Sequence, residues 1–381
     1  MTSQRFSATG PAADAGETVT AMPAAAGSEP SGSSRHAVFV QLNDPTGNSV
    51  LAYERSGDGR LSEAGRYPTG GNGGAAVQAP VDALASQGSL VYDPGHGRLY
   101  AVNAGSDSLT VFDVDGARLT RRQVMDSGGT FPVSVAVQGD LLYVLNAGGD
   151  GTVHGFRIVP DGLVPMPQSR RSLQLGNVSP PVFISAPAQV GISPDARHLV
   201  VTTKNHNTIN VFLLDRDGCP RGEPVVTSTA NPVPFSFAFT RQGIAVTEVG
   251  TSSVTHYKLN ADGTLTPLSS VADGQAALCW IQPLGGRLYG ANAGSGTISA
   301  FDLAPNGDVA LSGHDGGVVA QPGGAPIDMA ASGSYLYVQN PVAGRLDGYR
   351  AARDGTLQQV TAVTGLPLFA NGHGMEGIAA S

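Results

Sequence analysis

The 381-residue sequence has little charge, few cysteines and no long apolar run. Asp, Glu, Lys and Arg together make up only 14% of the residues, which argues against a coiled coil or a long-helix protein. No stretch approaches 18 consecutive apolar residues, so we expect no membrane-spanning segment and no membrane partner. The two cysteines, Cys219 and Cys279, are too few for a disulfide framework.

Basic residues are also scarce. There are 22 Lys and Arg against 30 Asp and Glu, which gives a formal net charge of −8. The chain has no lysine-rich tract, and its only lysines are Lys204 and Lys258. Binding of DNA or RNA depends on clustered cations that release counterions. We therefore expect no nucleic-acid partner.

Motifs for other chemistries are missing as well. The sequence has neither the G-x-S-x-G of α/β-hydrolases nor a G-x-x-x-x-G-K-[ST] phosphate loop. The eight histidines form no H-x-x-x-H pair, and the cysteines form no C-x-x-C motif. We expect no cofactor and no metal site built from a contiguous motif.

Residues 1–35 differ in composition from the rest of the chain. They are rich in Ala, Ser, Gly, Thr and Pro and show no apolar periodicity, so we expect a disordered tail. The segment lacks the apolar core of a signal peptide. We therefore expect a cytoplasmic protein, or an exported one if an N-terminal signal precedes this sequence.

From residue 36 onward one phrase recurs seven times. An apolar run ends in a turn such as Asn-x-Gly, an alternating apolar and polar run follows, and Asp-Gly or Asn-Gly leads into another short run. Before each phrase except the first lies a further apolar run and a turn. The copies read FVQLNDPTGNSVLAYERSGDGRL from Phe39, LYAVNAGSDSLTVFDVDGARL from Leu99, LYVLNAGGDGTVHGFRIVPDGL from Leu142, LVVTTKNHNTINVFLLDRDG from Leu199, IAVTEVGTSSVTHYKLNADGTL from Ile244, LYGANAGSGTISAFDLAPNGDV from Leu288 and LYVQNPVAGRLDGYRAARDGTL from Leu336.

Four antiparallel strands per repeat, at a period near 45 residues, are typical of a β-propeller blade. The final residues, MEGIAAS, resemble the first strand of a blade, whereas the segment from His36 begins with the second. The two ends therefore complete one blade, with 377–381 beside the strand that starts at His36. We predict an all-β, seven-bladed propeller, closed by the C-terminal strand, as a single domain over residues 36–381.

The repeat resembles the lactonase-type seven-bladed propellers, a family that includes bacterial 6-phosphogluconolactonase and the fungal carboxymuconate cyclases. The resemblance covers about 345 residues and rests on the LYVxN, VxxF/Y and DGxL elements of each copy. It implies a propeller fold and, in active members, lactone chemistry. Glu248, in TEVGTSSVTHY, stands where the family's fifth blade usually has a glutamate.

Other polar positions of the family are replaced. Where the fourth blade usually has a histidine pair, this chain has Ala188 and Gln189. The Asp-Arg pair of the same blade is replaced by Asn-Thr at 207–208, and the Arg-His pair of the next by Phe-Ser at 235–236. The arginine of blade six is Ala293 here. A phosphorylated lactone needs a cluster of arginines, so we expect a non-phosphorylated substrate.

The recurring Asn of the NAG turns is interpreted as structural, because it repeats in five blades. Departures from the repeat are better site candidates. Glu248 would be a general base, with Lys204 or Arg345 as the cation that stabilises an oxyanion. These side chains are expected at the channel mouth on the face formed by the turns after second strands and by the links between blades. Candidate substrate-binding residues are His206, Asp328, His373 and Glu376.

Two functions stay open at this point. The first is hydrolysis or formation of a small lactone. The alternative is a non-catalytic propeller that binds a small molecule, a glycan or a protein on its loop-rich face. In both cases we expect a small-molecule ligand or another binding partner at this face, and a monomeric protein.

Overall fold

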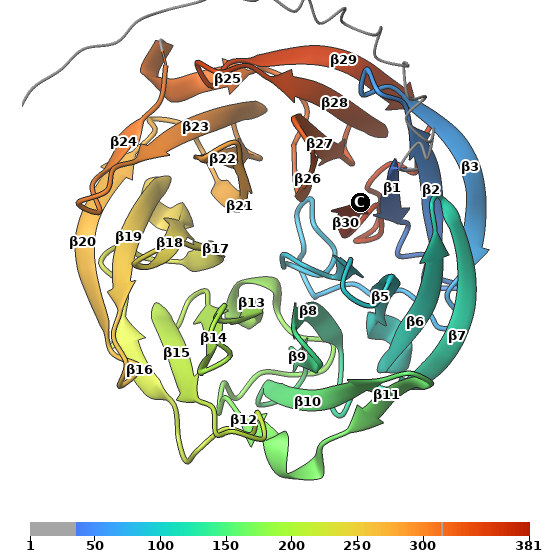
Figure 1. The fold of residues 1–381 in the computed structure, drawn as a ribbon, viewed down its shortest axis with the longest axis vertical. Coiled ribbons are helices and arrows are strands. Elements are labelled where there is room, and N and C mark those ends of the chain that lie inside the picture. Colours follow the sequence, from blue (N-terminus) through green and yellow to red (C-terminus); the bar gives the residue numbers. More distant parts are fainter. Residues whose placement is uncertain (1–35, 314) are drawn as a thin grey trace, which may run out of the picture. The chain divides into compact units, whose positions relative to one another are not determined.

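Each sequence repeat folds into one antiparallel sheet, and seven such sheets are arranged around a central channel (Figure 1). The computed structural model describes residues 36–313 and 315–381. The predicted tail, 1–35, lies outside the described residues. Blade one contains β1 (His36–Gln41), β2 (Ser49–Arg55), β3 (Leu61–Pro68) and β30 (Ile378–Ala380); blade two contains β4 (Leu90–Asp93), β5 (Arg98–Asn103), β6 (Ser108–Asp115) and β7 (Arg118–Asp126).

Blades three and six each gain a fifth short strand, which no sequence pattern predicted. In blade three β12 pairs with β10, and in blade six β25 pairs with β23. Blade three contains β8 (Pro132–Gln138), β9 (Leu141–Asn146), β10 (Thr152–Val159), β11 (Gly162–Pro165) and β12 (Arg171–Ser172); blade six contains β21 (Leu278–Leu284), β22 (Arg287–Asn292), β23 (Thr297–Leu303), β24 (Val309–Leu311) and β25 (Val318–Ala320).

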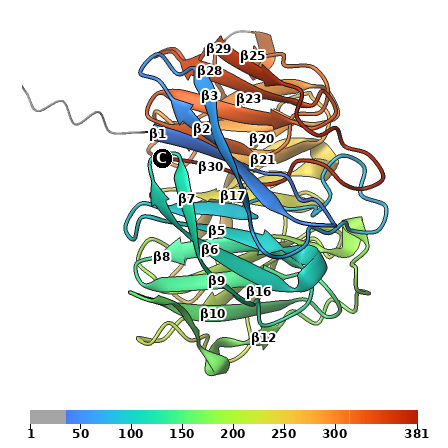
Figure 2. The ribbon, with the colours of Figure 1, turned by 90° about the vertical axis from the view of Figure 1, so that its right-hand side faces the viewer.

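The three other blades have four strands each, as predicted, and short 3₁₀ turns lie in the connections of the described residues. Figure 2 shows the ring of blades from the side. Blade four contains β13 (Pro187–Ile192), β14 (His198–Thr203), β15 (Thr208–Leu213) and β16 (Val225–Ser228); blade five contains β17 (Pro234–Phe239), β18 (Gly243–Glu248), β19 (Ser253–Leu259) and β20 (Leu265–Ala272); blade seven contains β26 (Met329–Ser332), β27 (Tyr335–Asn340), β28 (Arg345–Ala351) and β29 (Leu357–Thr364). The 3₁₀ turns are η1 (Ala104–Ser106), η2 (Pro167–Ser169), η3 (Phe183–Ser185), η4 (Val249–Thr251) and η5 (Asp315–Gly317).

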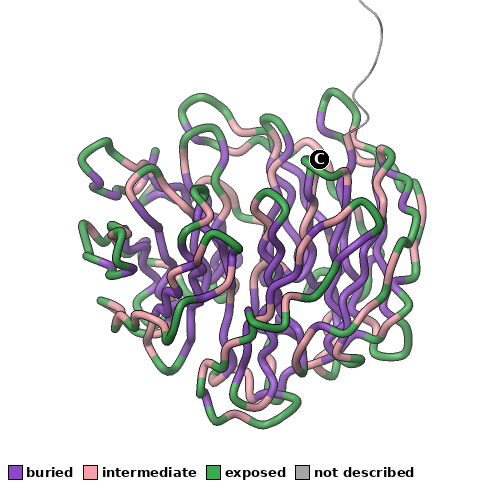
Figure 3. The backbone as a smooth tube through the Cα atoms, turned by 60° about the horizontal axis from the view of Figure 1, so that its bottom comes forward, coloured by how far each residue is buried: buried purple, intermediate pink, exposed green. Residues whose placement is uncertain are grey.

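Burial decreases from the second strand of a blade to the outermost strand (Figure 3). All six residues of β5 and of β9 are buried, because adjacent blades pack on both faces of these strands. The outermost strand β7 has one buried residue, Leu119, and its last five positions alternate between exposed and half-buried. Continuous apolar runs therefore mark second strands, and polar alternation marks outer strands.

The recurring turn asparagines have the structural role that the repeat predicted. The Asn103 amide donates to the hydroxyls of Ser108 (3.2 Å) and Thr110 (2.9 Å) on the third strand. Asn292 makes the equivalent bonds to Thr297 (3.1 Å) and Ser299 (2.9 Å) in blade six. The amide thus fixes the turn between the second and third strands.

The ring closes as predicted, through the last residues of the chain. Strand β30 pairs antiparallel with β1, with Val40 opposite Ile378 and Val38 opposite Ala380. The backbone N–H of Gln41 also donates to the carbonyl of Gly377 (3.0 Å). The closing strand covers the edge of β1 that would otherwise be open to pairing with another chain.

Candidate functional site in the central channel

The ring has two faces. The loop-rich face carries the turns after second strands and the links between blades, and the turn face carries the turns between first and second strands. The first strand of each blade is the inner edge of its sheet. Edge strands present backbone N–H and C=O groups that are not hydrogen-bonded to a neighbouring strand. The channel wall is therefore rich in backbone donors and acceptors.

The link between blades one and two enters the channel and fills its loop-rich end (Figure 1). We call residues 76–88 of this link the plug. The Ser86 hydroxyl donates to the carbonyl of Val133 (2.8 Å), and the Gln87 N–H donates to the carbonyl of Ala188 (3.1 Å). The indole N–H of Trp280 donates to the carbonyl of Ser86 (2.9 Å). The plug is thus bonded to blades three, four and six.

A second long link supports the plug from the loop-rich side. Val77 forms a parallel bridge with Val182. Its N–H donates to the carbonyl of Pro181 (2.8 Å), and its carbonyl accepts from Phe183 (2.9 Å). The face expected to hold an open channel mouth is therefore crossed by two loops.

Three ionisable side chains meet at the plug, and all are buried: Asp82 is 1% exposed, Lys204 1% and Glu376 2%. The Asp82 carboxylate accepts from the N–H groups of its own loop, at 2.9 Å from both Ala85 and Ser86. The Glu376 carboxyl accepts from Leu84 (3.1 Å). The Lys204 Nζ donates to the carbonyl of Ala85 (2.8 Å).

Burial controls the protonation of this cluster. It raises the pKa of the Glu376 carboxyl well above its usual range, and the adjacent Asp82 charge raises it further. Burial also raises the pKa of Asp82 and lowers the pKa of Lys204 to about 7, against the opposing effect of the Asp82 charge. Two carboxyl groups that hydrogen-bond to each other need one proton between them, and we assign it to Glu376.

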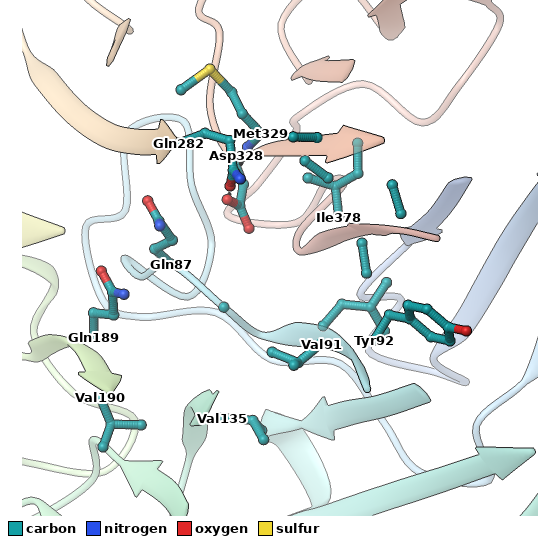
Figure 4. A pocket seen from close by; sticks show the side chains of 16 residues that line it. Gln87, Val91, Tyr92, Val135, Gln189, Val190, Gln282, Asp328, Met329 and Ile378 are labelled. Atoms are coloured by element: carbon teal, nitrogen blue, oxygen red, sulfur yellow. Dashed lines mark hydrogen bonds between the residues drawn. The ribbon is translucent and has the colours of Figure 1, made fainter. Parts of the chain in front are cut away.

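A cavity of about 280 Å³ lies in the channel between the plug and the turn face (Figure 4). Its inner part is lined by Gln87 of the plug and by Asp328, and its outer part by residues near the ends of first strands, such as Tyr92 and Gln282. Among the described residues that line it there is no Lys, Arg or His. The cavity is therefore polar but carries no cation.

Asp328 is the acidic side chain that points into this cavity (Figure 4). It is 5% exposed, and burial raises the pKa of its carboxyl to about 7. The charge of Asp82 adds to this rise, whereas the N–H of Met329, 2.9 Å from Oδ1, opposes it. A carboxyl with a pKa near neutrality exchanges a proton readily at physiological pH.

Two glutamines of the cavity wall join neighbouring segments. The Gln87 amide donates to the carbonyl of Ile281 (3.0 Å) and accepts from its N–H (3.0 Å). Gln189 makes the same pair of bonds to Phe237, at 3.1 and 2.7 Å. Gln189, which stands where the family has a histidine, thus connects blade four to blade five.

The residues predicted for the site fall into two sets. Lys204 and Glu376 meet at the plug, and Asp328 lies below it on the cavity. His206 is exposed in the turn after β14. His373 is half-buried in the link before β30, where its backbone pairs with that of Ala370.

The proposed base Glu248 is fully buried within blade five. Its carboxylate accepts from the Asn231 amide (2.7 Å) and from the hydroxyls of Tyr257 (2.6 Å) and Thr255 (2.5 Å). These partners lie on or beyond β19, towards the outside of the ring. The Glu248 carboxylate is therefore directed away from the channel.

Arg345 is likewise held within its own blade. Its Nε bonds to Asp347 (2.9 Å), and its guanidinium also donates to the carbonyl of Pro322 (2.5 Å). Asp347 is fully buried, and burial raises the pKa of its carboxyl while Arg345 opposes the rise. Glu248, Lys204 and Arg345 thus have separate sets of partners.

Replacing Glu248 with Gln tests this placement. The amide would turn an NH₂ group towards hydroxyl and amide donors, so we expect the free energy of unfolding to fall by about 1–3 kcal/mol. Hydrolysis of any lactone substrate should stay at the wild-type rate. The measurements are urea unfolding and an ester-hydrolysis assay. If hydrolysis is lost while the free energy of unfolding is unchanged, Glu248 takes part in the reaction.

Sequence reasoning missed Asp82, Gln87 and Trp280. None of the three belongs to a motif. The only signal for Asp82 and Gln87 was the unusual length of the link before Leu90, and Trp280 lies in an apolar run that repeats in every blade. Among the described residues no three His, Cys, Asp or Glu side chains are grouped to hold a metal ion. In the part of the chain that the structure describes, no helix is long and apolar enough to cross a membrane.

Comparisons with known proteins found proteins of the same fold. A family model described as "Lactonase, 7-bladed beta-propeller" matches residues 12–166. This match covers less than half of the 381-residue chain. The structure shows a seven-bladed β-propeller, and the first part of the chain is similar to the lactonase family of such propellers. No curated protein matches the chain.

Solved structures similar to this protein share its fold at low sequence identity. The periplasmic gluconolactonase of Pseudomonas aeruginosa is 18% identical with a TM-score of 0.68, covering 88% of this chain and 98% of that one. A putative 6-phosphogluconolactonase from Bacteroides uniformis is 17% identical with a TM-score of 0.67, covering 88% and 97%. Another from Bacteroides fragilis is 16% identical with a TM-score of 0.67, covering 93% and 100%.

Proposed function

We propose that this lactonase-like propeller binds a small, neutral lactone in the channel cavity and hydrolyses it, with Asp328 as general base. The observation that carries the proposal is a carboxyl with a pKa near 7 in a cavity whose described lining has no basic residue. A general base works best when its pKa lies near the operating pH. This proposal moves the base from Glu248 to Asp328.

The character of the cavity supports a neutral ligand. A phosphate or carboxylate group would lose its hydration without gaining a cation, which is costly. Hydroxyl groups of a sugar lactone, by contrast, would find the Gln282 amide and the unpaired backbone groups of edge strands. The volume of about 280 Å³ lies at the small end of ligand pockets. A single-ring lactone is therefore the preferred class.

The reaction needs only these groups. The Asp328 carboxylate takes a proton from a water molecule while the water oxygen attacks the lactone carbonyl carbon. Backbone N–H groups of the edge strands would stabilise the oxyanion. The ring C–O bond then breaks, and the proton on Asp328 passes to the leaving ring oxygen. The product is a hydroxy acid, and the Asp328 carboxylate is restored.

The names of the similar structures agree with this choice to different extents. The Pseudomonas protein is named as a gluconolactonase, whose name refers to a lactone without phosphate. The Bacteroides proteins are named as putative enzymes of the phosphorylated lactone. The absence of a cation among the cavity's described lining residues favours the first of these two substrate classes for this chain.

A second candidate is binding of the same ligand without turnover. The burial of Glu248 within its blade favours it, because the general base taken over from the family resemblance has no access to the channel. In that case the propeller would hold a neutral polyol or lactone in the same cavity. The affinity would then be unaffected by removing the charge of Asp328.

A lactone panel tests the proposal. Glucono-δ-lactone and its 6-phosphate would be incubated with the protein, and acid release would be compared with that from heat-inactivated protein. We expect turnover of the neutral lactone, with a kcat/KM at least about tenfold above that of the phosphate. A preference for the phosphorylated lactone would overturn the assignment. Binding of the neutral lactone without acid release would favour the second candidate.

A further inference from the structure

The plug offers acceptors to a wall of buried donors. The Nζ of Lys204, from blade four, donates to the carbonyl of Ala85 (2.8 Å). The indole N–H of Trp280, from blade six, donates to the carbonyl of Ser86 (2.9 Å). Glu376, before the closing strand, shares a hydrogen bond with the carboxylate of Asp82. Three donors from distant parts of the chain thus meet two carbonyls and one carboxylate.

Aromatic rings flank these donors. The Lys204 Nζ lies 5.4 Å from the ring centre of Phe183 and 5.5 Å from that of Phe235. Phe235 in turn packs edge-on against Trp280, with ring centres 5.1 Å apart. One cation and one neutral indole donor beside apolar rings are suited to a small molecule with a carboxylate at one end and an apolar group at the other.

From this arrangement we infer that the loop-rich end of the channel is a binding site for a small carboxylate, which residues 76–86 occupy as an internal ligand. The site consists of Lys204, Trp280, Glu376 and the flanking rings. A carboxylate would accept from the Lys204 ammonium and from the Trp280 indole in place of the plug carbonyls. This site adjoins the cavity of the proposed lactone hydrolysis, which Gln87 lines, but it does not depend on that function.

Two non-glycine residues of the plug have a left-handed backbone conformation. Ala85, whose carbonyl is the acceptor for Lys204, has a φ of 60°, and Gln78 has a φ of 66°. A left-handed backbone costs a non-glycine residue about 1–2 kcal/mol. Residues 76–86 form no strand or helix, and their one bridge is between Val77 and Val182. Departure of the plug would relieve this strain.

Removal of the plug without replacement would leave Trp280 as a buried donor with no acceptor, and would leave Lys204 with only the carbonyl of Pro187, 3.4 Å away. An unpaired buried polar group costs about 1–3 kcal/mol, and a charged one more. The site therefore needs an occupant with acceptor oxygens at all times. A carboxylate ligand meets this need, because it brings two acceptor oxygens and a negative charge opposite Lys204.

Two side chains report on the plug directly. Trp280 is the only tryptophan, so its emission follows the contact with Ser86. Cys279 is 8% exposed beside it, and burial raises the pKa of its thiol, so labelling should be slow while the plug is seated. The experiment uses full-length protein with Cys219→Ser, which leaves Cys279 as the sole thiol. Propionate is titrated at fixed pH and ionic strength, with methyl methanethiosulfonate as the thiol reagent.

We expect a saturable change in Trp280 emission and a rise of about tenfold in the Cys279 labelling rate with propionate. Propionamide and chloride should have no effect. Lys204→Met should abolish the response, whereas Lys258→Met, at the exposed second lysine, should keep it. Asp82→Asn removes the internal carboxylate and should lower the propionate concentration at half-saturation.

Several results would overturn the inference. If propionate changes neither the Trp280 emission nor the Cys279 labelling rate, in the wild-type background and in Asp82→Asn, the plug is a permanent part of the fold. An equal response to propionamide would exclude recognition of a carboxylate. If Lys204→Met does not fold, the wild-type and Asp82→Asn titrations decide the question. None of these readouts involves lactone hydrolysis.

Discussion

Asp328→Asn is expected to lower kcat for neutral-lactone hydrolysis by about 10²–10⁴-fold, the usual contribution of a general base. The amide has nearly the same shape but cannot take a proton from water. Because the pKa of Asp328 is raised to about 7, the ionised fraction in the wild type increases as the pH passes through 7. The wild-type kcat should therefore increase between about pH 6 and pH 8 and then level off.

The matched control is Asp273→Asn. Asp273 is also a buried aspartate, 4% exposed, and burial raises its pKa, but its carboxylate accepts from Ser299 within blade six. This variant should keep the wild-type pH profile. A kcat of Asp328→Asn within about twofold of the wild type would exclude Asp328 as the base, and unchanged lactone affinity in both variants would then favour binding without turnover.

Deletion of residues 377–381 should lower the free energy of unfolding by about 5 kcal/mol. Burial of Ile378, 4% exposed, contributes about 2 kcal/mol, and the hydrogen bonds of β30 about 1 kcal/mol each. The segment also receives a bond from Gln339 to the Gly377 carbonyl (2.9 Å) and donates one from the Gly377 N–H to Ser89 (2.8 Å). Blades one, two and seven would all lose contacts.

The measurement is urea unfolding combined with size-exclusion chromatography. The deletion uncovers the edge of β1, so we expect association of the truncated chains as well as lower stability. A synthetic peptide of residues 374–381, added in excess, should restore part of the lost stability, and a scrambled peptide should not. A truncated protein that unfolds at the wild-type urea concentration would show that the ring is held closed without β30.

The fold could be predicted because each blade repeats the same physical pattern. The run LYVLN from Leu142 had to be a strand covered on both faces, and the asparagine after it had to serve the turn. Closure followed from counting strands at the two ends of the chain. Strands β12 and β25 were missed, since two or three residues such as Arg171–Ser172 carry no periodicity that could mark them.

The site was less predictable, because it is formed by contacts between segments that lie far apart in the sequence. Lys204 was singled out as a departure from the repeat and Glu376 by its place before the closing strand, and the structure brings both to the plug. Their partner Asp82 could not be identified, because nothing in the sequence tells that a long link turns inwards. Glu248 stood at a family position, but its direction depends on Asn231 and Tyr257, which only the folded blade brings near it.

Obstruction of the loop-rich end by residues 76–88 has a kinetic consequence. Because the plug blocks one end of the channel, a ligand that enters the cavity past Tyr92 and Gln282 must leave by the same opening. Incoming and outgoing molecules then exchange in turn and cannot pass through the ring in one direction. Slow departure of a reaction product would delay the next arrival, so residues around that opening would govern turnover without touching the reacting atoms.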